Sequence, residues 1–139
     1  MALACVRLGI EFRLSAPKGY EFPQDFLDSM ETVEGSGSLV QITEPAEAID
    51  GVDAVYTDVW SSMGQEKEQK QREKDFAGHQ VNAKLMALAP SAIFLHCLPA
   101  KRGQEVTTEV IDGPQSRIVE QAANRMHAQK AILAWLLQQ

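Results

Sequence analysis

The residues with the clearest capacity for chemistry stand in two short runs that each follow an apolar stretch. The first is Asp58-Val59-Trp60-Ser61-Ser62-Met63, and the second is His96-Cys97-Leu98-Pro99. A carboxylate such as Asp58 can hold a substrate ammonium through charge-assisted hydrogen bonds, while the hydroxyl of Ser62 and the thioether of Met63 offer a polar and a soft apolar contact. A histidine beside a thiol suggests nucleophilic catalysis or polar recognition. The first run therefore favours a small ligand that carries an ammonium group.

Each of these residues also has a purely structural interpretation. Asp58 could cap a following helix, because aspartate is common at that position. Cys97 could be a small buried side chain beside a hydrogen-bonded His96, and since adjacent strand residues point to opposite faces, a covalent role for the thiol is the weaker functional interpretation. Arg125 offers a guanidinium fork for a phosphate or carbonyl oxygen, or it is a surface arginine. Residue types alone leave these alternatives open.

Three other motifs carry no functional prediction. Gly35-Ser36-Gly37 lacks the third glycine of a dinucleotide-binding loop and lies between a helix and a strand in the reverse of the required order, so we interpret it as a helix stop. His79 and His127 have no partners at metal-ligand spacing. Lys101-Arg102 is too short for a nucleic-acid patch.

Length and composition describe one ordinary globular domain. The chain has 139 residues, of which 45% are hydrophobic and 23% charged, and its net charge is −6. These values exclude wholesale disorder, and the lack of a basic block argues against binding to nucleic acid or to an anionic membrane. No apolar run reaches the roughly 18 residues of a membrane span. The distant Cys5 and Cys97 favour a reducing cytoplasm over a disulfide scaffold, and we expect no metal or other cofactor.

Strand-like and helix-like segments alternate along the chain. Short apolar runs predict strands, and apolar residues at helical spacing between Pro and Gly punctuation predict helices. The expected strands are Ile10 to Ala16, Leu39 to Thr43, Ala54 to Thr57, Ala92 to Leu95 and a short Arg117 to Val119. The expected helices with defined ends are Ala2 to Leu8, Pro23 to Gly35, Pro45 to Ile49, Val81 to Leu88 and Thr107 to Ile111. A further, polar helix is expected where Glu66 faces Lys70 and Glu68 faces Arg72. The last expected helix carries an apolar stripe of Ala122, Met126, Leu133 and Leu137.

This alternation predicts an α/β fold with a doubly wound, mostly parallel sheet flanked by helices, because parallel strands need right-handed crossovers. In such sheets the chemistry lies in loops at the carboxyl ends of the strands. Two loops meet this condition, Asp58 to Glu66 after the third strand and His96 to Gly103 after the fourth. We therefore expect Asp58 and Cys97 to lie side by side along one edge of the sheet.

The same two runs resemble the second domain of the ornithine carbamoyltransferases. Further motifs that match are Pro17-Lys18-Gly19-Tyr20, Val81-Asn82, Arg102-Gly103-x-Glu105-Val106 and Asn124-Arg125-Met126-His127-Ala128-Gln129-Lys130. The resemblance covers essentially the whole chain in order. Its Asp…Ser-Met-Gly signature is specific within transcarbamoylases and favours ornithine as the second substrate. The resemblance implies that residues 1–139 form an ornithine-binding domain with the Rossmann-like fold of that family.

The implied reaction joins carbamoyl phosphate and L-ornithine to give L-citrulline and phosphate, in arginine biosynthesis or catabolism. Carried over by position, Asp58, Ser62 and Met63 hold the amino-acid end of ornithine. Cys97 and Leu98 contact ornithine around its reacting side. The Ser-Met-Gly loop is expected to close over the substrate.

Three residues are implied in the catalytic chemistry itself, namely Cys97, His96 and Arg125. The resemblance places His96 and Arg125 on the carbamoyl phosphate side, where they polarise the carbonyl or bind its oxygens. One departure touches this group, because Ala123 stands where the family usually has an acidic residue before Asn124.

The largest departure is length, since the family's enzymes are about twice as long and their carbamoyl phosphate domain, with its Ser-x-Arg-Thr loop, has no counterpart in the sequence. We therefore expect the chain to be inactive alone. The helix within residues 120–139 packs on that domain in the family, so here we expect it to be frayed, repacked on the local core or buried in self-association. The family's homotrimer forms largely through the other domain and is not carried over.

Two alternatives remain at this stage. One is a non-catalytic α/β module, descended from a transcarbamoylase, that binds an amino acid or a protein. The other is an unrelated enzyme of the same fold, which requires both signature loops to coincide by chance.

Overall fold

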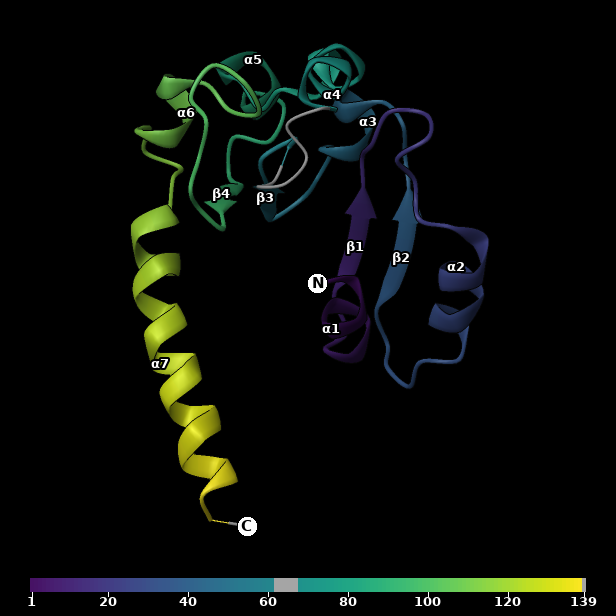
Figure 1. Ribbon diagram of the computed structural model, residues 1–139, viewed down its shortest axis with the longest axis vertical. Coiled ribbons are helices and arrows are strands. Elements are labelled where there is room, and N and C mark those ends of the chain that lie inside the picture. Colours follow the sequence, from purple (N-terminus) through teal and green to yellow (C-terminus); the bar gives the residue numbers. More distant parts are fainter. Residues whose placement is uncertain (62–67, 139) are drawn as a thin grey trace. The chain divides into compact units, whose positions relative to one another are not determined.

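The computed structural model describes residues 1–61 and 68–138 of the chain (Figure 1). It divides into two compact units, Met1–Asp50 and Gly51–Gln139. Each unit contains one pair of parallel strands with helices around it. The α/β class expected from the alternation of segments is thus confirmed, and hydrogen bonds join the described strands as two pairs.

The first unit is built on β1 (Glu11–Leu14) and β2 (Ser38–Gln41), in which Phe12 lies opposite Leu39. Phe22 extends the apolar side of this pair, because its ring lies 6.4 Å from that of Phe12 and 4.6 Å from that of Phe26. The elements of the unit are α1 (Ala2–Arg7), β1 (Glu11–Leu14), α2 (Gln24–Glu31), β2 (Ser38–Gln41) and α3 (Pro45–Ala48).

Gly35 and Gly37 stand where two stretches of backbone meet in this unit. The N–H of Gly37 donates to the carbonyl oxygen of Val6 over 3.0 Å. A side-chain carbon on Gly35 would overlap that same carbonyl, and one on Gly37 would lie 2.5 Å from the carbonyl oxygen of Ile10. Glycine is required because the two backbones approach too closely for a Cβ atom. The Gly-x-Gly motif thus serves packing.

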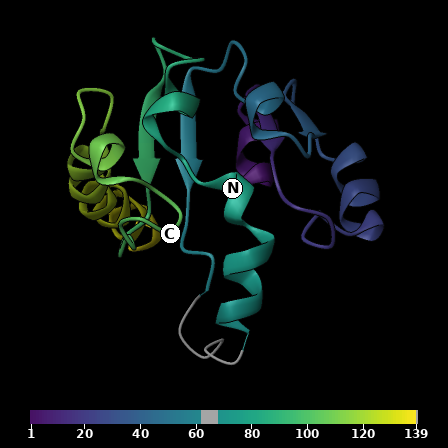
Figure 2. The same cartoon turned by 90° about the horizontal axis from the view of Figure 1, so that it is seen from above.

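The second unit is built on β3 and β4, which run parallel and side by side (Figure 2). Tyr56 lies opposite Leu95, and Thr57 lies opposite His96. Isolated bridges join Phe94 to Ser116 and Val81 to Val106. The elements of the unit are β3 (Ala54–Thr57), α4 (Gln69–Asp75), the 3₁₀ turn η1 (Ala77–His79), α5 (Ala83–Met86), β4 (Ile93–His96), α6 (Thr108–Ile111) and α7 (Ile118–Leu136).

The core of the second unit is centred on β4. Phe94 and Val106 have no exposed area, and His96 and Glu105 are as completely buried. Alternate β4 residues are buried because side chains of a strand point to opposite faces, which puts Phe94 and His96 on the same inner face. Nearby, Trp60 stacks on Phe76 with ring centroids 5.9 Å apart.

Several expected elements differ in extent from those observed. Arg117 to Val119 is not a strand, since the bridge to β4 is made by Ser116 and the chain turns directly into α7. The helix expected over Val81 to Leu88 is limited to α5, because Val81 pairs with Val106 and Asn82 caps the helix by accepting the N–H of Leu85.

At the helix predicted to begin with Pro23, that proline is the N-cap and α2 begins one residue later. The helix ends at Glu31, so the predicted stop at Gly35-Ser36-Gly37 lies beyond its end. The polar helix is α4, where Arg72 contacts the Glu68 carboxylate as predicted, whereas Glu66 of the other pair lies outside the described residues.

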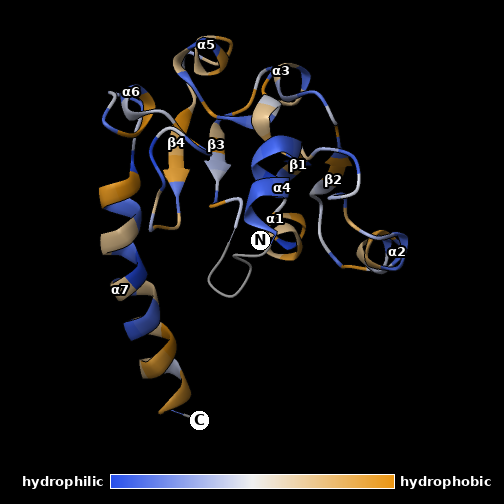
Figure 3. Ribbon diagram, turned by 45° about the horizontal axis from the view of Figure 1, so that its top comes forward, coloured by the Kyte–Doolittle hydropathy of each residue, from blue (hydrophilic) through white to orange (hydrophobic). Residues whose placement is uncertain are grey.

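The last helix, α7, extends from Ile118 to Leu136 with its side chains largely exposed, and apolar and polar residues alternate along it (Figure 3). Met126, Leu133 and Trp135 are each more than half exposed. The helix is therefore neither frayed over this range nor repacked on the core of its unit, and self-association through it stays a prediction. In the part of the chain that the structure describes, α7 included, no helix combines the length and the apolar character needed to cross a membrane.

Candidate functional site

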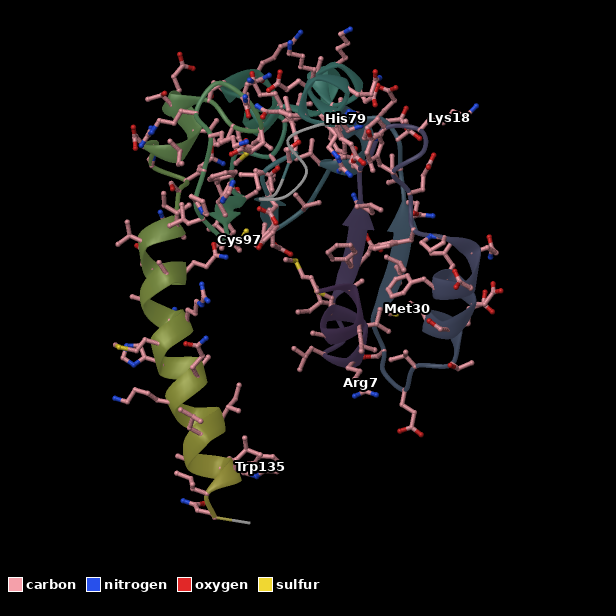
Figure 4. All side chains as sticks on the ribbon, viewed as in Figure 1. Arg7, Lys18, Met30, His79, Cys97 and Trp135 are labelled. Atoms are coloured by element: carbon pink, nitrogen blue, oxygen red, sulfur yellow. The ribbon has the colours of Figure 1, made fainter. Side chains whose placement is uncertain are left out.

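The ends of β3 and β4 bring Asp58 and Cys97 together. The two strands are in parallel register with Thr57 opposite His96, so the next residue of each strand is Asp58 or Cys97. The Cys97 thiol interacts with both the Asp58 carboxylate and the Tyr56 hydroxyl, and Cys97 lies at the exposed end of β4 (Figure 4). Asp58 is exposed, and one of its oxygens accepts the N–H of Val59 over 2.7 Å. The structure thus places an accessible carboxylate beside a thiol at the carboxyl edge of a parallel pair.

The environment of Cys97 favours the protonated thiol. Burial raises the pKa of Cys97, and the Asp58 carboxylate raises it further, because it hydrogen-bonds the protonated thiol and, to a smaller extent, because a second negative charge beside it is unfavourable. The Tyr56 hydroxyl acts in the opposite direction, since it can donate to the thiolate. A thiol with a raised pKa is a poor nucleophile at neutral pH. Cys97 is therefore suited to contact a ligand and not to attack it.

Tyr56 belongs to the same cluster, although it is not among the residues selected from the sequence. Burial raises the pKa of its phenol above the usual range, and the neighbouring Cys97 adds to this effect. Tyr56 and Asp58 are two residues apart along β3 and its extension, so their side chains point to the same face. This two-residue spacing is the sequence signal that would have identified Tyr56.

The ring of His96 makes its hydrogen bonds within the protein, whereas the resemblance implies a role toward carbamoyl phosphate. Its ring is fully buried, with Nε2 at 3.2 Å from Oε1 of Glu105, and Nδ1 accepts the N–H of Leu98 over 2.8 Å. Both ring nitrogens are therefore engaged within the protein. A role in polarising a substrate carbonyl requires a free nitrogen that faces the ligand, and this conformation offers none.

Leu98 has an unusual backbone. Its φ is +57°, in the left-handed region that residues other than glycine rarely adopt, and the Leu98–Pro99 peptide bond is cis. The side chain is 40% exposed. Leu98 thus follows Cys97 in a tight turn and presents an apolar side chain at the same strand end.

Arg125 lies on α7, one turn after Gln121. The side-chain oxygen of Gln121 accepts the N–H of His96 over 2.9 Å, which ties the start of α7 to the end of β4. Residues four apart share a helix face, so Arg125 is on the side of α7 that Gln121 presents to β4. Arg125 is exposed and makes no hydrogen bond to any described residue. Its guanidinium is therefore available to a ligand.

Two of the residues selected from the sequence, Ser62 and Met63, lie outside the described residues. The other five fall in the second unit. The structure brings Asp58, Cys97 and Leu98 to one pair of strand ends, buries His96 behind them and places Arg125 on the adjoining helix. Over residues 1–61 and 68–138, no group of three or more His, Cys, Asp or Glu side chains is arranged to hold a metal ion.

Comparison with known proteins identifies the family. The family model described as "Aspartate/ornithine carbamoyltransferase, Asp/Orn binding domain" matches residues 1–136. The chain belongs to this carbamoyltransferase family. This membership contradicts the alternative of an unrelated enzyme that shares only the fold.

Individual members of the carbamoyltransferase family support the assignment. The ornithine carbamoyltransferase of Caldicellulosiruptor saccharolyticus is 51% identical over 133 residues, which are 94% of this chain and 43% of that protein. Among solved structures, the Giardia lamblia ornithine transcarbamoylase has a TM-score of 0.84 at 33% identity, and covers 95% of this chain and 43% of its own. The Pyrococcus furiosus enzyme has a TM-score of 0.79 at 45% identity, with coverage of 88% and 40%. The chain thus spans less than half the length of these carbamoyltransferases.

Proposed function

We propose that the chain is the ornithine-binding half of an ornithine carbamoyltransferase. The observation that carries the proposal is the exposed Asp58 carboxylate beside the Cys97 thiol at the ends of β3 and β4. An accessible carboxylate at a strand end suits the α-ammonium of an amino acid, with which it makes charge-assisted hydrogen bonds. The family match and the names of the relatives supply the identity of that amino acid.

The reaction proposed for the complete site is carbamoyl transfer. The neutral δ-amine of ornithine attacks the carbamoyl carbon of carbamoyl phosphate, and a C–N bond forms. The tetrahedral intermediate then breaks its C–O bond and releases phosphate, while the attacking nitrogen loses a proton, to give citrulline. We assign the reaction to arginine metabolism in the cytoplasm, a compartment in which free thiols such as those of Cys5 and Cys97 persist.

The residues of this chain would act mainly by holding and orienting ornithine. Asp58 holds the amino-acid end together with Ser62 and Met63. Cys97 and Leu98 contact the side chain near the reacting amine. Because the raised pKa of Cys97 keeps its thiol protonated, we propose that it acts by contact without forming a covalent bond.

Arg125 is proposed to serve the other substrate. Its guanidinium is exposed on α7 on the side nearest β4, and a guanidinium can stabilise negative charge that develops on the carbonyl oxygen of the tetrahedral intermediate. A site of this kind needs several such donors around the phosphate. The 139 residues contain no Ser-x-Arg-Thr phosphate loop, so we expect the chain by itself to form no citrulline.

Titration calorimetry with L-ornithine tests the binding proposal directly. Asp58→Asn should weaken ornithine affinity about 10- to 100-fold, since a hydrogen bond to a charged group is worth about 1.5–3 kcal/mol. The matched control is Ser15→Ala, because Ser15 holds the corresponding position after β1 in the first unit, where its hydroxyl donates to the carbonyl oxygen of Thr43. Equal affinity in the Asp58→Asn variant, or no binding by the unaltered chain, would contradict the proposal.

A further inference from the structure

Two ionisable side chains are completely buried behind the strand ends, and the proposed chemistry uses neither of them. The side chains of His96 and Glu105 have no exposed area. Together with Ser61, they are the buried polar residues of the part of the chain that the structure describes. Burying an imidazole and a carboxyl group is unfavourable unless both are well hydrogen-bonded. Their bonds therefore indicate what the pair does.

The hydrogen bonds of His96 fix where its ring proton lies. A backbone N–H can only donate, so the 2.8 Å contact from the N–H of Leu98 makes Nδ1 an acceptor. The ring proton is then on Nε2, which donates to Oε1 of Glu105 over 3.2 Å. The same Oε1 also accepts the N–H of Lys101 over 2.5 Å. The pair thus satisfies two backbone N–H groups on either side of the Leu98–Pro99 turn.

The turn needs such support because Leu98 is held at a φ of +57°. For a residue with a side chain the left-handed region is unfavourable, and it persists only where surrounding contacts enforce it. The acceptor at Nδ1 of His96 is one such contact, and it exists only while the ring proton remains on Nε2. Glu105 keeps the proton on Nε2 because its Oε1 accepts the hydrogen bond that Nε2–H donates.

We propose that Glu105 acts through His96 as a positioning residue, which fixes the Leu98 turn and so aims Cys97 and Leu98 at the amino-acid ligand. The inference rests on the proposed function for the identity of that ligand, but the hydrogen bonds and the backbone conformation of Leu98 are measurable without it. A pair that only stabilised the core would not need to determine the conformation of Leu98.

Two substitutions of His96 separate positioning from packing. In His96→Asn the carboxamide oxygen can take the place of Nδ1 and accept the N–H of Leu98, whereas in His96→Gln the carboxamide nitrogen takes the place of Nε2 and donates to Glu105. If only packing matters, Asn should be the worse replacement because it removes more volume. Positioning predicts the reverse order. Relative to the unaltered chain, ornithine affinity should fall about tenfold in His96→Gln and within about threefold in His96→Asn.

Substitutions of Glu105 provide a second matched pair. Glu105→Gln keeps an oxygen in the place of Oε1 and puts the amide nitrogen where Oε2 stands, an atom that has no hydrogen-bond partner among the described residues. Glu105→Met has similar length but no acceptor. We expect ornithine affinity within about threefold of the unaltered chain for Glu105→Gln and about tenfold weaker for Glu105→Met. Val110→Ala, in the buried face of α6, controls for a general loss of stability.

Nuclear magnetic resonance of the unaltered chain gives an answer that does not depend on ligand binding. Ring ¹⁵N shifts should show the proton of His96 on Nε2, and the coupling between the amide and α protons should report a positive φ at Leu98. That φ should persist in His96→Asn and become negative in His96→Gln. A ring protonated on Nδ1, or a positive φ retained in His96→Gln, would overturn the inference. Absence of ornithine binding with these signals intact would instead contradict the proposed function alone.

Discussion

The two strand pairs of this chain share one geometry and differ in what their carboxyl ends carry. In the first unit, Ser15 follows β1 and its hydroxyl donates to the carbonyl oxygen of Thr43, so a short side chain closes the strand ends. In the second unit, Asp58 and Cys97 stand at the corresponding ends and leave an exposed carboxylate. Parallel pairing thus brings side chains together at the carboxyl ends of two strands in both units. Only in the second unit do those side chains include a carboxylate that is exposed to a ligand.

The strand pairs also differ in burial. Residues of β1 and β2 are exposed or half-buried, whereas Phe94 and His96 of β4 are fully buried. The Cys97 side of the polar edge therefore follows a buried core strand, whereas Asp58 follows β3, whose residues are exposed or half-buried. A ligand site benefits from such support, because groups held by a packed element keep their geometry.

The largest expected difference between the pairs is in stability. Phe94→Ala should lower the free energy of unfolding by about 3–5 kcal/mol, because a completely buried aromatic ring leaves a cavity. Phe12→Ala is the matched change in β1, where the ring is half-buried, and it should reduce the free energy of unfolding by roughly half as much. Urea denaturation followed by circular dichroism measures both values. Equal losses would show that the two pairs are equally well packed.

A smaller effect should be the same in both units. Gly19 and Gly103 have φ values of +93° and +83°, and a side-chain carbon at either position would meet no atom within 4 Å. Substitution by alanine should therefore reduce the free energy of unfolding by about 1–2 kcal/mol at each site, through backbone conformation alone. Gly78→Ala is the control, since Gly78 has open space and no left-handed φ. Unequal losses at Gly19 and Gly103 would mean that burial influences these turns as well.

The most subtle test concerns the reactivity of Cys97. Because the Asp58 carboxylate raises the pKa of the thiol, Asp58→Asn should lower that pKa and increase the rate of alkylation by iodoacetamide at pH 8. Tyr56→Phe should do the opposite, because it removes the hydroxyl that lowers the pKa. Rates resolved by peptide mass spectrometry distinguish Cys97 from Cys5. A change of the same sign in both variants would disprove this coupling within the cluster.

The sequence was sufficient to locate both strand ends, but the expected end of the fourth strand differs from the observed end by one residue. The fourth strand was expected to end at Leu95, which would leave His96 in the loop beside Cys97. The observed β4 includes His96, and the alternation of a strand then sends its side chain inward with that of Phe94. The contact between Glu105 and His96 joins residues nine positions apart, a separation that matches neither helical nor strand periodicity, so it is visible only in the folded chain.

The last helix illustrates another limit of pattern reasoning. Its apolar stripe was visible in the sequence, but a stripe indicates only that a face could be covered. Ser116 pairs with Phe94, so the strand expected at Arg117 to Val119 gives way to the start of α7. In the structure Met126 and Leu133 of that stripe are both more than half exposed.

The placement of the two tryptophans has an optical consequence. Trp60 stacks on Phe76 two residues after Asp58, whereas Trp135 is 61% exposed near the far end of α7. Indole emission shifts to the red in water, so the two side chains should contribute distinguishable bands. Replacing Trp135 with phenylalanine would leave Trp60 as the single tryptophan, two residues from the carboxylate that we assign to ornithine. Its emission, excited at the red edge of indole absorption where tyrosine does not absorb, could then follow ligand capture in real time without any attached dye.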